Sequence, residues 1–185
     1  MNVLGIAGSL RAGSYNRGLL LAALEVRPER MAIEIWEGLR DVPVFDADLE
    51  AVATPEPVAG LAAAIAAADG VLIATPEYNH GVPGVLKNVL DWVSRASVGA
   101  PLRGKPVALV GAAEGAAGSA RAQLELRPTL ATMGALVLAT PSVLVGGVSA
   151  RFDGSLRLTD EPTREHLAGL LSAFADWIEL VGLRA

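Results

Sequence analysis

The chain of 185 residues contains no cysteine and is poor in aromatic and charged residues. Without cysteine there is no disulfide, thiolate nucleophile or iron–sulfur ligand. The two histidines, His80 and His166, lie far apart with no pattern of carboxylates around them, which argues against a zinc site. The formal net charge of -5 provides no basic excess for a nucleic-acid backbone. We therefore expect neither a metal centre nor a nucleic-acid partner.

Long hydrophobic runs are scarce as well. The most apolar stretch, Val58 to Thr75, approaches the length that spans a bilayer, but it is rich in alanine and is interrupted at Asp69 and Gly70. This interruption divides it into a helix-like piece and a short strand-like piece. The first residues of the chain carry no charged segment ahead of the apolar ones, unlike a signal peptide. We therefore expect a soluble, cytoplasmic protein without a membrane partner.

Hydrophobic residues make up 52% of the chain, which is enough for one domain, residues 1–185, with a full core. Short apolar runs alternate with longer helical patterns along its whole length. The runs predict strands at Val3–Ala7, Ala32–Trp36, Val71–Ala74, Pro106–Val110 and Ala135–Ala139. The longer patterns predict helices at Asn16–Glu25, Pro57–Ala68, Val82–Arg95, Ser119–Gly134 and Thr163–Leu180.

The predicted strands are continuously apolar except for Glu34, which places Ala32–Trp36 nearer an edge of the sheet. Continuous apolar runs are typical of strands buried on both faces of a parallel sheet. Their alternation with helices predicts a doubly wound α/β fold. Five strands fit a flavodoxin-like three-layer sandwich, with strand order 2-1-3-4-5, better than a six-stranded dinucleotide-binding fold. Two connections, residues 37–56 and 140–161, are long for a compact domain, and we expect them to be functional or interfacial.

In this topology ligands bind at the carboxyl ends of the strands, between the first and third. The first loop there, Gly8 to Asn16, reads G-S-L-R-A-G-S-Y-N and leads into a helix whose free N–H groups and dipole favour an anion. It lacks the triphosphate and dinucleotide glycine motifs, so a single phosphate paired with Arg11 fits best. The same residues also suit a plain helix cap by Ser14 or Asn16 with a solvated Arg11.

Two further loops end strands at this edge of the sheet. The second loop, residues 75–84, reads T-P-E-Y-N-H-G-V-P-G. It can present backbone N–H groups and the Tyr78 ring to a planar heterocycle, although a tight helix-capping turn explains it as well. The third loop, residues 111–118, consists mostly of tiny residues that let a ligand approach the backbone. It contains no aromatic side chain that could cover a ring.

Four motifs carry a resemblance that extends over essentially the whole chain. They are G-S-L-R-x-G-S-x-N in the first loop, P-E-Y-N-H-x-x-P-G-x-L-K-N-x-x-D-W at residues 76–92, A-R-A-Q-x-x-L-R at residues 120–127, and F-D-x-x-x-x-L-T-D-E at residues 152–161. In this combination the sequence resembles the NADPH-dependent FMN reductase family of flavodoxin-like proteins, which includes quinone, chromate and azo-dye reductases.

The resemblance implies FMN as cofactor and NADPH (or NADH) as co-substrate. It implies ping-pong transfer of electrons to a small acceptor such as a quinone, free flavin, azo dye or metal oxyanion. FMN would carry the chemistry, so no catalytic side chain is expected. By the same resemblance, the cofactor phosphate is surrounded by Ser9, Arg11, Ser14, Tyr15 and Asn16. The ribityl chain and ring are met by Pro76, Glu77, Tyr78 and Asn79, and by Ala112, Glu114, Gly115 and Gly118 of the third loop, which is usually richer in glycine in this family.

Two other functions remain as alternatives: a flavodoxin-type electron carrier and an FMN-dependent redox sensor. Carriers generally shield the flavin between bulky aromatic side chains, whereas this chain offers only Tyr78 near the ring. The reductase is therefore the favoured interpretation. The long connection at residues 140–161 and the apolar composition predict a homodimer or a homotetramer.

Overall fold

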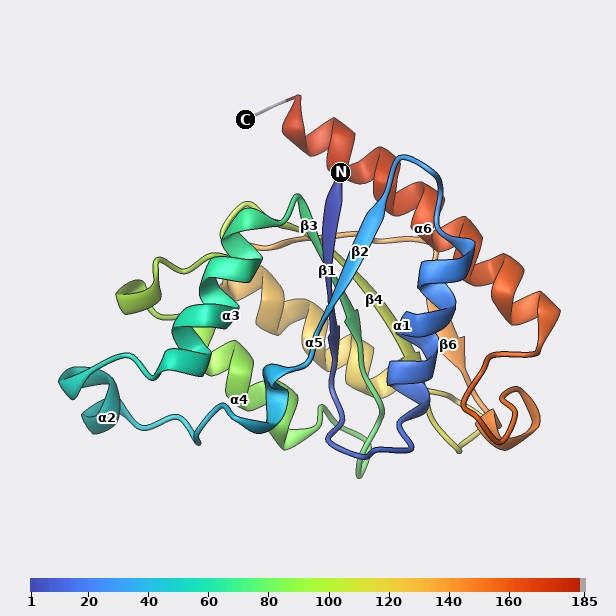
Figure 1. The fold of residues 1–185 in the computed structure, drawn as a ribbon, viewed down its shortest axis with the longest axis horizontal. Helices are drawn as coiled ribbons and strands as arrows, with labels where there is room; N and C mark the ends of the chain where they lie inside the picture. The colour runs from blue at the N-terminus through green and yellow to red at the C-terminus, as the bar shows by residue number, and fades with distance from the viewer. Residues whose placement is uncertain (184–185) are drawn as a thin grey trace.

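A parallel β-sheet forms the centre of the computed structural model, which describes residues 1–183 (Figure 1). Within these residues the sheet has six strands in the order β2-β1-β3-β4-β5, with β6 also paired to β4. The strands are β1 (Asn2–Ala7), β2 (Ala32–Trp36), β3 (Gly70–Ala74), β4 (Pro106–Ala112), β5 (Leu136–Val137) and β6 (Val143–Val145). This topology confirms the predicted flavodoxin-like order.

Helices cover both faces of the sheet and make the expected three layers (Figure 1). One face carries α1 (Tyr15–Val26) and α6 (Glu161–Gly182). The other carries α3 (Glu56–Ala67), α4 (Gly84–Val93) and α5 (Ala120–Thr132). Among the described residues, no helix combines the length and the apolar character needed to cross a bilayer.

The two central strands are buried along their whole length because both of their faces are covered. Side chains alternate along a strand, so neighbours in β3 belong to different cores. Leu72 and Ala74 pack with α1 and α6, whereas Val71 and Ile73 pack with the opposite helices. This two-sided burial explains why the sequence of these strands is continuously apolar.

The predicted fifth strand, Ala135–Ala139, is shorter in the structure and is followed by a second piece. β5 pairs with the start of β4, and β6 pairs with its end at residues 110–112. Pro141 lies between the two pieces, and proline has no N–H to give to a strand ladder. The edge of the sheet is therefore built from two short strands instead of one.

The two long connections contain short elements that the sequence does not predict. Residues 37–56 hold the turn η1 (Gly38–Arg40) and the helix α2 (Ala47–Val52), which buries none of its described side chains. α2 projects from the body of the protein (Figure 1). Residues 140–161 hold β6 and the turn η3 (Val148–Ala150). A third turn, η2 (Ala96–Val98), follows α4.

Candidate functional site

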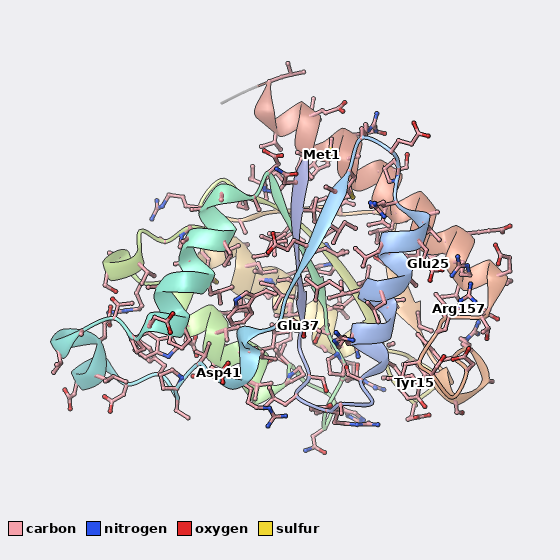
Figure 2. All side chains as sticks on the ribbon, viewed as in Figure 1. Met1, Tyr15, Glu25, Glu37, Asp41 and Arg157 are labelled. Atoms are coloured by element: carbon pink, nitrogen blue, oxygen red, sulfur yellow. The ribbon has the colours of Figure 1, made fainter. Side chains whose placement is uncertain are left out.

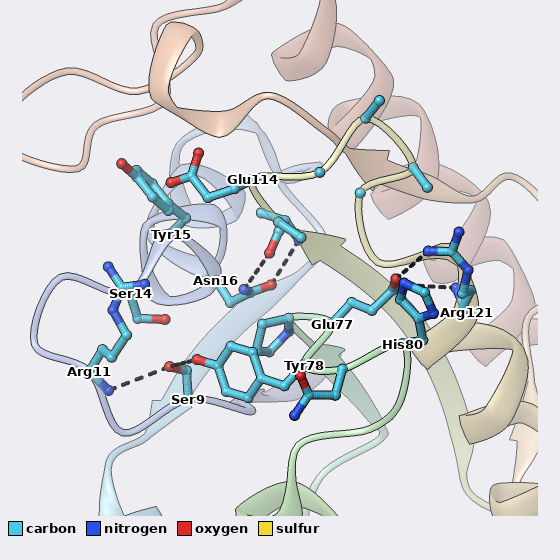
Figure 3. A pocket seen from close by; sticks show the side chains of 18 residues that line it. Ser9, Arg11, Ser14, Tyr15, Asn16, Glu77, Tyr78, His80, Glu114 and Arg121 are labelled. Carbon is cyan, nitrogen blue, oxygen red and sulfur yellow. Dashed lines mark hydrogen bonds and ion pairs between the residues drawn. The ribbon is translucent and has the colours of Figure 1, made fainter.

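A pocket of about 610 Å³ lies where β1, β3 and β4 end. The first, second and third loops surround it (Figure 3). All thirteen residues proposed from the sequence line this pocket: Ser9, Arg11, Ser14, Tyr15, Asn16, Pro76, Glu77, Tyr78, Asn79, Ala112, Glu114, Gly115 and Gly118. The pocket thus lies beside β1 and β3, where the strand order reverses, as the topology predicts.

The first loop ends in a capped helix. The Oγ atom of Ser14 accepts a hydrogen bond from the N–H of Arg17 at 3.3 Å, which makes Ser14 the N-cap of α1. The first turn of a helix has N–H groups that no helical carbonyl can reach, and here this turn borders the pocket. The Arg11 guanidinium is exposed and donates to the carbonyl of Gly13 at 3.3 Å. Capping and anion binding are therefore compatible in this loop.

Asn16 joins the first loop to the third. Its Nδ2 donates to the Ala112 carbonyl at 2.8 Å, and its Oδ1 accepts from the Ala112 N–H at 2.9 Å. The Asn16 side chain is buried, so these bonds satisfy both backbone groups of Ala112 away from water. Asn16 lines the pocket, yet its amide is already committed to the protein itself.

The second loop folds into a tight two-residue turn. Tyr78 and Gly81 exchange two backbone hydrogen bonds, at 3.2 and 3.0 Å, around Asn79 and His80. Both central residues have positive φ, 49° and 67°, which is the backbone of a type I′ turn. Asparagine and histidine are both enriched among the non-glycine residues that adopt this conformation. The turn leaves the Tyr78 ring exposed at the pocket, with its hydroxyl 3.0 Å from the Oγ of Ser9 (Figure 3).

Glu77 fastens the second loop to α5. Its carboxylate accepts from the backbone N–H of Arg121 at 2.8 Å and from the Arg121 guanidinium at 2.7 Å. Burial acts to raise the pKa of Glu77, but the hydrogen bonds from Arg121 and from the N–H of Ala122 outweigh it and hold that pKa below its ordinary value. The Glu77 carboxylate is therefore ionised at neutral pH.

The third loop depends on two glycines. A Cβ on Gly111 would lie 1.9 Å from the Oγ of Ser119 and 2.3 Å from a backbone oxygen, so a side chain does not fit there. Gly118 has a φ of 59° and lies close to the backbone of β6. The N–H of Ala113 donates to the carbonyl of Val145 at 2.9 Å. The second piece of the split edge strand thus supports the third loop.

The connection at residues 140–161 reaches the same site. The ring of Phe152 lies 5.2 Å from the ring of Tyr15, measured between their centres. Tyr15 lines the pocket, so the connection packs behind one of its walls. A functional part for this connection stays a prediction, and the contact with Tyr15 places the connection next to the pocket.

Five further residues line the pocket: His80, Ala113, Ala116, Ala117 and Arg121. The three alanines belong to the third loop, and His80 belongs to the second motif, so the sequence already predicts that they lie near the ligand-binding edge of the sheet. Arg121 is the residue that sequence reasoning missed. It stands in the A-R-A-Q motif, but a role for it becomes visible only when the fold brings it beside Glu77, 44 positions earlier in the chain.

The sequence model of the family described as NADPH-dependent FMN reductase matches residues 1–150. The chain belongs to this family. This membership confirms the resemblance carried by the four motifs. It also assigns an oxidoreductase activity with FMN as cofactor and reduced nicotinamide as co-substrate.

Named members resemble this FMN reductase chain over nearly its full length. An NAD(P)H-dependent FMN reductase of Pseudomonas aeruginosa is 41% identical over 178 residues, covering 96% of this chain and 95% of the relative. A quinone reductase of Escherichia coli (strain K12) is 38% identical over 183 residues, covering 98% of this chain and 97% of the relative. The solved structure of FerB, a flavoenzyme NAD(P)H:(acceptor) oxidoreductase from Paracoccus denitrificans, has a TM-score of 0.85 at 34% identity, covering 96% of this chain and 97% of FerB.

Proposed function

We propose that the chain is a single-domain NAD(P)H:acceptor oxidoreductase that binds FMN in the pocket between the three loops. It passes electrons from reduced nicotinamide to a small molecule such as a quinone, free flavin, azo dye or metal oxyanion. The observation that carries this proposal is the combination of a helix N-terminus, an exposed tyrosine ring and a loop of tiny residues around one pocket. A quinone acceptor is supported by the names of its relatives.

The first loop supplies what the phosphate of FMN needs. Two negative charges are favoured at the positive end of the α1 dipole, where first-turn N–H groups can donate to phosphate oxygens. Arg11 is exposed at the pocket and can add a bond to a charged partner. Ser9 and Tyr15 line the same wall. The donor set of this loop therefore fits a phosphate monoester.

The second and third loops supply the site for the ring. Tyr78 offers a flat surface, which its bond to Ser9 holds in place. Across the pocket, Ala116 and Ala117 are exposed and carry only methyl groups. One side of a bound ring would thus stay accessible to a second molecule. When bound, FMN supplies the redox chemistry by taking a hydride at N5 and passing electrons on.

An open side that serves donor and acceptor in turn predicts ping-pong kinetics. Reciprocal plots of NADPH oxidation at several fixed quinone concentrations should be parallel lines. Intersecting lines would contradict the ping-pong scheme. An electron carrier or a redox sensor would show almost no steady NADPH oxidation with a quinone, so this assay also separates the two alternatives from the reductase.

The accessible side can be tested by closing it. Ala116→Trp places an indole at the exposed third loop and should slow flavin reduction by NADPH while FMN stays bound. The matched control is Ala59→Trp, on the exposed surface of α3. Stopped-flow measurement of flavin reduction compares the variants. Equal rates in Ala116→Trp and in the wild type would contradict an open ring face at this loop.

We also propose a homodimer or a dimer of dimers, located in the cytoplasm, where reduced nicotinamide is available to an enzyme of this kind. The projecting connection at residues 37–56 supports self-association. Its side chains Val44 and Val52 are 80% and 84% exposed, which is unusual for large aliphatic residues close together in one segment.

A further inference from the structure

An ion pair is built into the wall of the pocket. Glu77 comes from the second loop and Arg121 from the first turn of α5, and their side chains meet beside the pocket (Figure 3). The Glu77 side chain is only 8% exposed, whereas that of Arg121 is 51% exposed and lines the pocket. Glu77 is thus fixed by burial and holds the Arg121 side chain at the surface of the pocket.

Glu77 accepts a hydrogen bond from the first turn of α5, as an N-cap side chain would. Within the described structure, the side chain of Ser119, the N-cap, makes no capping hydrogen bond. The carboxylate of Glu77 instead accepts from the first-turn N–H of Arg121. A charged group in this position is stabilised by the helix dipole as well as by the guanidinium. Glu77 therefore fixes the start of α5, the second loop and Arg121 together.

The other charged side chains of the pocket wall are less constrained. Arg11 and Glu114 lie on the opposite side from the pair (Figure 3) and are exposed to solvent. Among the described residues that line the pocket, the arginines and the glutamates are balanced, with two of each. Removing one charge from the fixed pair would give the pocket a net charge of one sign.

We propose that the Glu77–Arg121 ion pair sets the relative affinity of this pocket for oxidised and reduced FMN, an inference that rests on the proposed FMN site. Reduced FMN carries additional negative charge on its ring, and charges near N1 and N5 tune a bound flavin. Arg121 favours the reduced form, and Glu77 opposes this effect while it holds Arg121 in place. Glu77 is thus a positioning residue for Arg121, and its negative charge balances the positive charge of Arg121.

The test is the two-electron midpoint potential of bound FMN in three charge variants. Glu77→Gln leaves Arg121 unbalanced and should favour reduced over oxidised FMN by about tenfold, a rise of about 30 mV. Arg121→Gln leaves Glu77 unbalanced and should lower the potential by a similar amount. The double variant should return to the wild-type value. Spectrophotometric titration of the FMN-loaded proteins against redox dyes measures all of these potentials.

The opposite signs separate this role from a merely structural one. Loosening of the second loop would weaken both redox forms of FMN, so it would leave the potential unchanged or shift it in the same direction in both single variants. Either of these results overturns the inference. Arg30→Gln is the matched control, because Arg30 forms an exposed ion pair with Asp176 at the other end of the sheet. A wild-type protein that binds no FMN overturns the proposed function itself, which is a distinguishable failure.

Discussion

Three side-chain contacts hold the loops of the pocket to one another. Asn16 joins the first loop to the third, the hydroxyl of Tyr78 joins the second to the first, and Glu77 joins the second to α5 directly after the third. All three contacts join residues of the chain to one another, so the protein's own hydrogen bonds hold the three loops around the pocket.

At Arg11, a single charge can be removed without disturbing the core. We expect Arg11→Ala to weaken FMN binding by about 1.5–3 kcal/mol, the range for hydrogen bonds to charged groups. Fluorescence titration of the apoprotein with FMN measures the effect. Arg103→Ala is the control, because Arg103 is exposed in the turn that precedes β4, at the opposite end of the sheet. An unchanged affinity in Arg11→Ala would refute a phosphate contact.

The lowered pKa of Glu77 makes part of the stability depend on pH. Since this pKa is lower in the folded than in the unfolded protein, the stabilisation is complete above the ordinary glutamate value of about 4.3 and is lost as the pH falls through the folded value. The wild type should exceed Glu77→Gln in free energy of unfolding at pH 7, and this difference should shrink toward pH 3. Urea denaturation of both apoproteins at each pH measures this difference in free energy of unfolding. All other carboxylates are the same in the two proteins, so their contributions to the difference cancel. A difference that stays constant would contradict the lowered pKa.

At the scale of elements, the sequence predicts β1 to β4 from short apolar runs and the five main helices from longer helical patterns. The fifth strand is different. β5 and β6 contain two and three residues, too few to show a period, and their separation depends on where β4 offers partners. The helix α2 escapes prediction for a related reason, since it buries no apolar stripe.

The sequence likewise predicts one part of the candidate site and misses another. Loop residues that stand next to a strand end in the sequence line the pocket, because the topology alone brings those ends together. Arg121 and the pairing of Asn16 with Ala112 join positions 44 and 96 residues apart. A single sequence contains no local pattern for such contacts.

The close packing of β4 against the start of α5 gives a prediction for one glycine. Gly111→Ala would push a methyl group into Ser119 and a backbone oxygen, and such overpacking should lower the free energy of unfolding by about 1–3 kcal/mol. Gly115→Ala is a control in the same loop, because a Cβ there meets no atom of the described residues within 4 Å. Its effect should stay within about 0.5 kcal/mol. Equal denaturation midpoints for the two variants would contradict the close contact.

At the scale of the whole molecule, two hydrophobic cores share one sheet. The pocket lies mostly outside them, because it is made largely from loops at the carboxyl ends of the strands; of its lining residues, Ala112 belongs to the core under α1 and α6, and Tyr15 packs against that core. The large exposed aliphatic side chains of residues 37–56 also lie outside both cores. Burial within one chain does not explain them, and the same is true of Leu124 and Leu183 elsewhere on the surface.

Self-association can be measured directly. The wild type should sediment at micromolar concentration with at least about twice the mass of the 19.0 kDa chain, because an interface would bury Val44 and Val52. Replacing both residues with aspartate should shift the protein toward 19.0 kDa. Leu183→Asp is the control, since Leu183 is 85% exposed but lies at the end of α6. A wild-type protein of 19.0 kDa would contradict the dimer.

Met1 and the final turns of α6 lie at one end of the sheet, and Tyr15 with the pocket lies at the other (Figure 2). An immobilising tag or a fused reporter attached at either of these two positions would point away from the mouth of the pocket. The protein could then be fixed to an electrode or a bead with the pocket still facing the solution. Attachment through a lysine on α4, such as Lys87, would not guarantee that orientation.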